Sequence, residues 1–336
     1  MIRIAINGFG RIGRNTFKAA FGRLKNLEFV AVNDLTDTKT LAHLLKHDTS
    51  YGMYDRDVSY DEQHVIVDGK KILVIAEKDP TKLPWKDLKI DVVLESTGRF
   101  TDEAGAAQHL TAGAKRVIIS APAKGGNVPT YVLGVNGQEY DAAHMVINNA
   151  SCTTNCIAPV AAVINEAFGV KKAMMTTIHS YTADQSLQDG PHKDLRRARA
   201  AAANMVPTST GAAIAVTETL PELKGLFDGL SIRVPTPVVS LADFTFVVSK
   251  ATTVEEVNLA IKKACTGSRF KGIMTWTDEP LVSSDFIKNP HSAVVDVGLT
   301  QVVDGDLVKV IAWYDNEWGY SNRLAEMAER VGKAIK

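Results

Sequence analysis

The chain has few cysteines, no excess of charge and no long apolar segment. Only three of its 336 residues are cysteine, a sparse and odd number that does not describe a disulfide framework. Lys and Arg together number 38, as do Asp and Glu, so the basic excess typical of nucleic-acid-binding proteins is missing. No apolar run approaches the roughly 18 residues that a membrane span needs, and residues 1–6 begin a strand pattern rather than a secretory signal. We therefore expect a cytoplasmic protein that binds neither nucleic acid nor membrane.

The first half of the chain alternates between two patterns. Short β-branched or apolar runs lie at residues 2–6, 28–33, 91–95, 116–120 and 144–148. Helical patterns separate them, the first at about residues 14–25, so this part predicts parallel βαβ units. At roughly 150 residues per domain, the length suggests about two domains.

The pattern changes after about residue 170. Extended segments follow one another with a single helical pattern, residues 253–265, between them, and residues 180–210 show no clear period. The segments are residues 172–179, 230–234, 238–250, 294–296 and 307–314. Few intervening helices favour a mixed or antiparallel sheet. Leu324, Met327, Val331 and Ile335 recur at steps of three or four residues, which predicts a C-terminal helix.

A glycine-rich turn follows the first predicted strand. Gly8, Gly10 and Gly13 form a G-x-G-x-x-G element that opens the first predicted helix, and this context favours dinucleotide binding over a structural turn. The helix N-terminus would offer N–H groups to a pyrophosphate. Asp34 ends the second strand, 21 residues beyond Gly13. Its carboxylate would accept hydrogen bonds from the ribose hydroxyls and repel the 2′-phosphate of NADP, so we predict NAD as the cofactor.

Cys152 precedes a helical pattern at residues 157–168 and lies where the first domain should end. A helix N-terminus favours the thiolate, so Cys152 is a candidate nucleophile, whereas Cys156 and Cys265 fit a buried core better. His179 ends an apolar run and leads into a polar loop, as a base delivered by a strand would. His43 and His47 have metal-ligand spacing but no third ligand, and we predict no metal.

Seven motifs in this chain resemble those of one family, the phosphorylating, NAD-dependent glyceraldehyde-3-phosphate dehydrogenases. They span nearly the whole chain in the family's order. The motifs are NGFGRIGR at 7–14, ASCTTNC at 150–156, HSYT at 179–182, HKDLRRAR at 192–199, PTSTGAA at 207–213, RVPTP at 233–237 and WYDNEWGYSN at 313–322.

The resemblance implies the chemistry and its residues. Cys152 would attack the aldehyde of glyceraldehyde 3-phosphate, and His179 would take the hydroxyl proton as a hydride leaves for NAD. Inorganic phosphate would then cleave the thioester to an acyl phosphate. The implied phosphate-binding residues are Ser151, Thr153, Thr182, Arg199, Thr210, Gly211 and Arg233. The implied cofactor-binding residues are Gly8, Gly10, Arg11, Ile12, Gly13, Asp34, Lys78, Ser120 and Asn316, with Lys78 where many members carry Arg.

The resemblance also implies the domain layout: an α/β chain with a Rossmann-type, doubly wound parallel-sheet domain and an α+β catalytic domain with a mixed or antiparallel sheet. Residues 1–151 and 316–336 would form the NAD-binding domain, with the C-terminal helix packed back on it. Residues 152–315 would form the catalytic domain. The irregular stretch at residues 180–206 would be the long loop at the core of a homotetramer, because structureless loops of this length are rare without a function.

Three alternatives stay open from the sequence. Erythrose-4-phosphate dehydrogenase uses much the same Cys and His chemistry but ends in hydrolysis rather than phosphorolysis. A non-catalytic NAD-binding or scaffolding protein would not need both Cys152 and His179. A cysteine hydrolase would leave the glycine-rich turn and Asp34 without a purpose.

Overall fold

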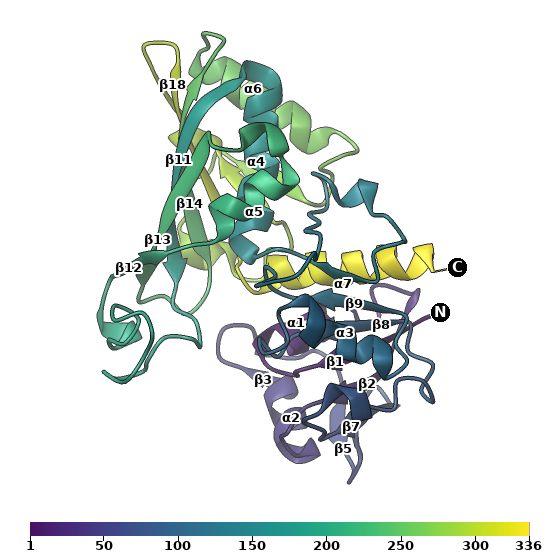
Figure 1. The fold of residues 1–336 in the computed structure, drawn as a ribbon. Helices are drawn as coiled ribbons and strands as arrows, with labels where there is room; N and C mark the ends of the chain where they lie inside the picture. Colours follow the sequence, from purple (N-terminus) through teal and green to yellow (C-terminus); the bar gives the residue numbers. More distant parts are fainter. Residues whose placement is uncertain (336) are drawn as a thin grey trace. The chain divides into compact units, whose positions relative to one another are not determined.

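The structure, a computed structural model, describes residues 1–335. It contains two compact units, each with its own sheet (Figure 1). The first comprises Met1–Tyr131, Glu139–Ala150 and Ser321–Lys336, and the second comprises Val132–Gln138 and Ser151–Tyr320. Lys336, the last residue of the predicted segment 316–336, lies outside the described residues. The domain bounds 1–151 with 316–336, and 152–315, stay a prediction.

The sheet of the first unit has the order β10-β9-β8-β1-β2-β7-β6-β5. The pairs from β10 to β7 are parallel, and β6 and β5 extend the sheet with antiparallel pairs. The strands are β1 (Ile2–Asn7), β2 (Leu27–Asn33), β5 (Val58–Tyr60), β6 (His64–Val67), β7 (Lys70–Ile75), β8 (Val92–Glu95), β9 (Arg116–Ile119) and β10 (Val146–Asn148). Ile4, Ala5 and Ile6 of β1 are buried; successive residues point to opposite faces, as expected of a parallel strand covered on both faces.

Helices connect these strands. They are α1 (Arg11–Ala20), α2 (Thr38–Lys46) and α3 (Glu103–Thr111), and a small separate hairpin pairs β3 (His47–Asp48) with β4 (Gly52–Met53). Helix α1 begins and ends earlier than the predicted residues 14–25. Gly10 caps its start in an extended conformation, and just beyond its end Gly22 adopts a φ of +78°, which interrupts a right-handed helix.

Helix α7 (Trp318–Ala334) begins in the second unit and continues into the first. A Cβ on Gly332 would lie 2.3 Å from Ile2 Cγ2, so this helix packs tightly on β1. Asn26 Nδ2 also donates to Glu329 Oε1 at 2.6 Å. These contacts put the C-terminal helix against the sheet of the first unit.

The sheet of the second unit has the order β12-β13-β11-β14-β18-β16-β15, with β17 beside β18, and mixes parallel with antiparallel pairs. Its strands are β11 (Val170–Ser180), β12 (Val206–Ser209), β13 (Phe227–Val234), β14 (Ser240–Val248), β15 (Met274–Thr277), β16 (Ala293–Asp296), β17 (Gln301–Val303) and β18 (Leu307–Tyr314). The helices are α4 (Cys152–Phe168), α5 (Ala212–Thr219) and α6 (Val254–Thr266). The two sheets confirm the predicted fold class.

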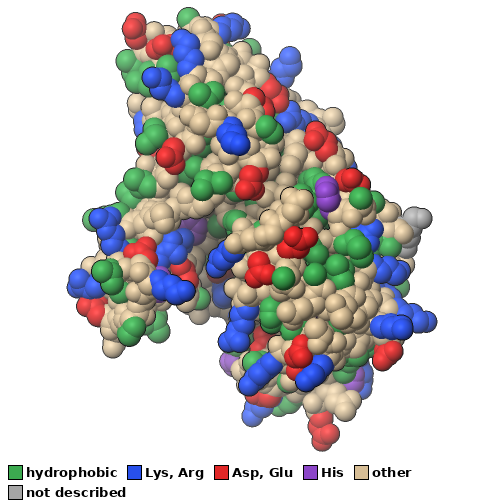
Figure 2. Space-filling view, viewed as in Figure 1, with side chains coloured by type: hydrophobic (Ala, Val, Ile, Leu, Met, Phe, Trp, Pro, Cys, Tyr) green, Lys and Arg blue, Asp and Glu red, His purple; other side chains and the backbone are tan. Residues whose placement is uncertain are grey.

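Charged side chains of both signs are interspersed on the face drawn in Figure 2. Among residues 1–335, no helix is both long and apolar enough to cross a membrane.

Candidate active site

The glycine-rich turn leaves open space at one glycine only. Gly8 has a φ of +91°, and a Cβ there would lie 2.7 Å from the Thr97 nitrogen. A Cβ on Gly13 would lie 2.3 Å from the Gly8 carbonyl oxygen, so the fold itself requires both glycines. A Cβ on Gly10 would meet no atom within 4 Å. The space beside Gly10 is therefore open to a ligand, at the start of a helix that Gly10 gives no side-chain cap.

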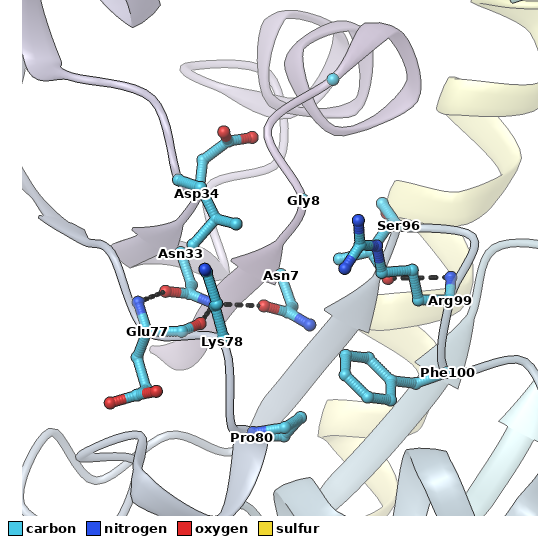
Figure 3. Close-up of a pocket in the computed structure, with 13 residues that line it drawn as sticks. Asn7, Gly8, Asn33, Asp34, Glu77, Lys78, Pro80, Ser96, Arg99 and Phe100 are labelled. Atoms are coloured by element: carbon cyan, nitrogen blue, oxygen red, sulfur yellow. Dashed lines mark hydrogen bonds between the residues drawn. The ribbon is translucent and has the colours of Figure 1, made fainter.

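A pocket of about 270 Å³ opens beside this turn (Figure 3). Its lining residues are Asn7, Gly8, Gly10, Asn33, Asp34, Leu35, Glu77, Lys78, Pro80, Ser96, Thr97, Arg99 and Phe100. Asp34 Oδ2 accepts from the Phe9 amide at 2.8 Å, and Oδ1 accepts from the Thr36 amide at 3.2 Å. A carboxylate oxygen can accept more than one hydrogen bond, so the half-buried Asp34 still has acceptor capacity for two ribose hydroxyls.

In the second unit, Cys152 and His179 face each other. Helix α4 begins at Cys152, and the preceding Ser151 caps it by accepting from the Thr154 amide at 3.0 Å. Strand β11 carries His179 at its end. Cys152 Sγ lies 3.5 Å from His179 Nε2, within the reach of a hydrogen bond to sulfur.

A backbone carbonyl fixes the orientation of the imidazole. His179 Nδ1 lies 2.7 Å from the Ser180 carbonyl oxygen. A carbonyl can only accept, so Nδ1 carries the proton and Nε2 of the neutral ring is the acceptor that faces the thiol. The pair therefore has the geometry of a nucleophile and its general base.

Burial and Arg233 govern the ionisation of this pair. Burial, and secondarily the Arg233 cation, lowers the pKa of His179 from 6.5 to about 3. Burial raises the pKa of the Cys152 thiol, while Arg233 opposes that rise. The expected thiolate at the helix N-terminus is thus disfavoured, because burial opposes a charge on the sulfur. Both pKa shifts favour the neutral forms of the thiol and the imidazole.

Thr182 and Arg233 form a hydrogen-bonded cluster next to His179. Arg233 Nη1 donates to Thr182 Oγ1 at 2.9 Å and lies 3.2 Å from His179 Nδ1. Among the described residues, no hydrogen-bond partner exists for the buried Arg233 Nε. A buried donor of this kind, on a guanidinium that suits phosphate oxygens, fits an anionic ligand.

Two family models match this chain. Residues 2–103 match the model described as glyceraldehyde 3-phosphate dehydrogenase, NAD binding domain, and residues 151–316 match the C-terminal domain of the same family. The chain belongs to the glyceraldehyde-3-phosphate dehydrogenase family. The predicted family, NAD-dependent enzyme class and NAD cofactor are thereby confirmed.

Relatives of this family match over nearly their full length. Glyceraldehyde-3-phosphate dehydrogenase 1 of Bacillus cereus is 57% identical over 98% of both chains. Glyceraldehyde-3-phosphate dehydrogenase of Geobacillus stearothermophilus is 56% identical over 98% of both chains. The enzyme of that name from Mycolicibacterium smegmatis is 55% identical over 99% of both chains.

The predicted cofactor-binding residues lie in different parts of the two units. The pocket of the first unit collects Gly8, Gly10, Asp34 and Lys78, and Arg11, Ile12 and Gly13 follow in α1. Ser120 follows β9, where its amide donates to the Glu95 carbonyl at 2.9 Å. Asn316 lies in the second unit, where its Oδ1 accepts from the Ser180 and Ser240 hydroxyls at 3.0 and 3.2 Å.

The predicted phosphate residues are only partly brought together. Arg233 and Thr182 adjoin His179, and Ser151 and Thr153 lie at the start of α4. Thr210 and Gly211 lie between β12 and α5, where Thr210 Oγ1 accepts from the Ala212 amide. Arg199 instead pairs with Asp189 at 2.8 Å on an exposed part of the loop.

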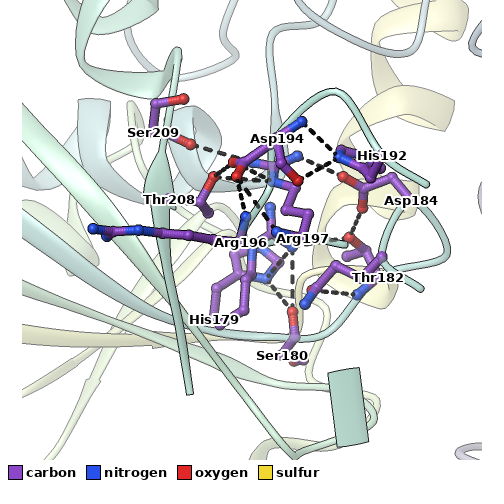
Figure 4. A network of polar contacts seen from close by, with 12 residues as sticks. His179, Ser180, Thr182, Asp184, His192, Asp194, Arg196, Arg197, Thr208 and Ser209 are labelled. Atoms are coloured by element: carbon purple, nitrogen blue, oxygen red, sulfur yellow. Dashed lines mark hydrogen bonds and ion pairs between the residues drawn. The ribbon is translucent and has the colours of Figure 1, made fainter. Parts of the chain in front are cut away.

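Sequence reasoning missed Arg197, which joins the cluster of Thr182 and Arg233 through Asp184. Its Nη1 donates to Asp184 Oδ2 at 2.5 Å, and Asp184 also accepts from the Thr182 hydroxyl (Figure 4). The side chain of Arg197 is 20% exposed, against 62% for Arg199. The motif HKDLRRAR holds both residues, and only contacts distant in the sequence separate them.

Tyr314 is a second residue that the sequence left without a role. Its hydroxyl oxygen lies 3.0 Å from Thr153 Oγ1 and 2.7 Å from Thr177 Oγ1, and its ring makes an edge contact with the imidazole of His179. Burial raises the pKa of Tyr314 well above its ordinary value, so the phenol stays protonated. Tyr314 thus ties the start of α4 to β11 and positions Cys152 relative to His179.

Buried polar side chains support the cofactor pocket and were also missed. Glu95 accepts from Asn7 Nδ2 at 2.5 Å and from the Thr97 amide at 2.8 Å, and its Oε2 lies 3.1 Å from His109 Nε2. Asn33 Nδ2 donates to Asn7 Oδ1 at 2.7 Å. These contacts hold the ends of three neighbouring strands at the edge where the pocket opens.

The two remaining cysteines have no catalytic partner in the described structure. Burial raises the pKa of Cys156 well above its ordinary value and that of Cys265 to about 12. The rings of His43 and His47 lie 4.9 Å apart. No group of three or more His, Cys, Asp or Glu residues within 1–335 could hold a metal ion.

Proposed function

We propose that this chain catalyses the reversible, NAD-dependent oxidative phosphorylation of glyceraldehyde 3-phosphate to 1,3-bisphosphoglycerate, with Cys152 as the nucleophile. The observation that carries the proposal is the 3.5 Å approach of Cys152 Sγ to the acceptor nitrogen of His179. The cationic Arg233 beside this pair supports an anionic substrate. The reaction is thus assigned from the site as well as from the family.

The first step is addition of the thiol to the aldehyde. His179 Nε2 accepts the Cys152 proton as Sγ bonds to the carbonyl carbon, and the proton passes to the carbonyl oxygen to give a thiohemiacetal. The start of α4 carries the positive end of a helix dipole, which stabilises the negative charge that develops on sulfur and oxygen.

Oxidation and phosphorolysis follow on the same sulfur. NAD, when bound, supplies the hydride acceptor. His179 removes the thiohemiacetal hydroxyl proton as the carbon loses its hydride, which leaves a thioester on Cys152. Inorganic phosphate then attacks the thioester carbon, the thiolate leaves, and His179 returns a proton to Cys152 Sγ. The low proton affinity of the buried imidazole favours this return.

The cofactor fits the first unit on its own geometry. A pyrophosphate can approach the backbone at Gly10, where a Cβ would meet no atom within 4 Å. Asp34 would hold the ribose hydroxyls and reject a 2′-phosphate, and Lys78 lines the same pocket. Arg11, Ile12 and Gly13 supply the backbone at the start of α1, and we assign Ser120 and Asn316 to the nicotinamide side.

Two phosphate groups need binding positions in this reaction. We assign Thr182 and Arg233 to one cluster together with Arg197, and we keep Ser151, Thr153, Thr210 and Gly211 as the remaining donors. Arg197 replaces Arg199 in this proposal because it contacts Asp184, the acceptor of the Thr182 proton. Comparing Arg197→Lys with Arg199→Lys tests the assignment: the first should raise the KM for a phosphate-bearing substrate about tenfold, and the second should leave it unchanged.

The overall reaction is tested by NADH formation from glyceraldehyde 3-phosphate, NAD and phosphate. Wild type should require phosphate, and Cys152→Ser should lose activity because a hydroxyl is a far weaker nucleophile. Equal rates for the two proteins would remove Cys152 from the mechanism. Phosphate-independent turnover, or faster oxidation of erythrose 4-phosphate, would favour the alternative sugar phosphate dehydrogenase.

We also propose a cytoplasmic homotetramer. Met174 and Ile214, which are 63% and 68% exposed, line one surface pocket together with the half-exposed Leu226. Exposed apolar side chains gathered in this way favour burial against another chain. Analytical ultracentrifugation should give four times the chain mass, and Met174→Lys should shift the protein towards smaller species.

A further inference from the structure

The carboxylate of Asp184 occupies the groups that a phosphate would use. Thr182 Oγ1 donates to Asp184 Oδ1, and Arg197 Nη1 donates to Asp184 Oδ2 at 2.5 Å (Figure 4). Thr182 Oγ1 in turn accepts from Arg233 Nη1 at 2.9 Å. One carboxylate therefore lies among two arginines and a hydroxyl, with its two oxygens as the acceptors.

Hydrogen-bond capacity makes this arrangement exclusive. A threonine hydroxyl has one proton to donate, and a phosphate oxygen without a proton can only accept. While the Thr182 proton points to Asp184, Thr182 cannot donate to a phosphate. The two anions therefore compete for the same hydrogen atom.

Arg197 is similarly engaged. Besides Asp184, its Nε donates to Thr208 Oγ1 at 3.0 Å and its Nη2 donates to the Ser209 carbonyl at 3.3 Å. All three guanidinium nitrogens thus contact protein. A phosphate can replace the contact to Asp184 without uncoupling Arg197 from β12.

Asp184 can leave the cluster more easily than the arginines. Its side chain is 44% exposed, and Arg197 is 20% exposed. An ion pair this accessible to water holds its geometry only weakly, so the carboxylate can rotate into solvent with little loss of packing.

We propose that Asp184 is an internal competitor for phosphate, which holds Thr182 and Arg197 in the free enzyme and is displaced by a phosphate group. The phosphate can be the ester of the sugar substrate or the free anion. This inference rests on the proposed phosphate site. Its consequence is that binding of phosphate is weaker and release is faster than the arginines alone would allow.

The test compares two isosteric changes in one loop. Asp184→Asn removes the competing charge, and its amide group can no longer accept at both positions. Asp189→Asn is the matched control, because Asp189 is also exposed and also pairs with an arginine, Arg199. Inorganic phosphate is titrated into each NAD-loaded protein by calorimetry, and KM is measured separately for phosphate and for glyceraldehyde 3-phosphate.

Asp184→Asn should lower the Kd for phosphate about tenfold, equivalent to ~1.4 kcal/mol, and Asp189→Asn should leave it unchanged. A fall in the KM for inorganic phosphate would mean that the free anion displaces Asp184, and a fall in the KM for glyceraldehyde 3-phosphate would mean that the phosphate ester does. An unchanged or raised Kd in Asp184→Asn, or equal tightening in both variants, would overturn the inference, since Asp184 would then position Arg197 or act only through net charge.

Two further measurements keep the outcomes separate. If wild type itself shows no phosphate binding and no phosphate-dependent turnover, the proposed function fails, not only the role of Asp184. If Asp184→Asn has a lower unfolding midpoint in urea than wild type, Asp184→Ala is measured as well. Tighter binding of phosphate in the alanine variant is then required.

Discussion

The depressed pKa of His179 predicts a specific dependence of stability on pH. The imidazole is 3% exposed, and its pKa falls from 6.5 to about 3 on folding, mainly because burial disfavours the imidazolium. Between these values the unfolded chain binds a proton that the folded chain does not. The contribution of His179 is therefore complete above pH 6.5 and is lost as the pH falls towards 3.

The magnitude follows from the linkage between protons and folding. One proton changes the free energy of unfolding by ~1.4 kcal/mol per pH unit. From pH 6.5 to pH 5, His179 should cost the wild type about 2 kcal/mol, and its total contribution to acid sensitivity is about 5 kcal/mol. His179→Asn removes this titration and can keep the hydrogen bond to the Ser180 carbonyl, because an amide N–H can replace Nδ1–H.

The assay is urea unfolding of wild type and His179→Asn at one protein concentration, from pH 8 to pH 4. The other titrating groups are shared, so the difference between the two curves isolates His179. The wild-type free energy of unfolding should fall towards that of the variant, or below it, as the pH decreases. Parallel curves would refute the reasoning, because they would mean that the folded protein holds a protonated imidazole.

Further changes test the cofactor site and the support of the catalytic pair. Gly10→Ala should raise the Kd for NAD while changing the stability of the NAD-free protein by only ~0.5 kcal/mol. Gly13→Ala should lower the thermal midpoint of the NAD-free protein, because it forces a Cβ onto the Gly8 carbonyl. Similar midpoints of the two variants in scanning calorimetry would contradict this contrast. Tyr314→Phe should lower stability in urea by ~1–3 kcal/mol, because two buried threonine hydroxyls lose a partner; an unchanged midpoint would remove its bridging role. Asp34→Ala should reduce the NAD to NADP ratio of kcat/KM, and an unchanged ratio would contradict the ribose contact.

The parts of the site that lie at strand ends could be predicted from sequence. A β-branched run followed by glycines fixes where β1 ends and α1 starts, so Gly8, Gly10 and Asp34 reach one pocket. The run that ends at His179 likewise predicts β11, whose last residue but one is His179. Local patterns predict the glycine-rich turn and His179 because these residues come at the end of a strand in the sequence, and therefore lie at its carboxyl end in the sheet.

Ionisation could not be predicted in the same way. The helix N-terminus at Cys152 indicated a thiolate, and α4 does begin there. Burial works in the opposite direction and raises the pKa of the Cys152 thiol. The dipole of a helix can be predicted from one segment of sequence, whereas the burial of the Cys152 sulfur depends on the whole fold around it.

The difference between Arg197 and Arg199 could not be predicted from sequence patterns either. Both belong to one motif in a loop without hydrophobic period, so neither propensity nor periodicity can tell them apart. The distinction comes from Asp184, 13 residues before Arg197, and from Thr208, 11 residues after it. A loop residue acquires its function from what its side chain meets across the loop, and those partners are set by the folding of residues 182–209 rather than by the motif. Resemblance can therefore locate the motif, while only the contacts show which of its arginines pairs with Asp184 beside Thr182.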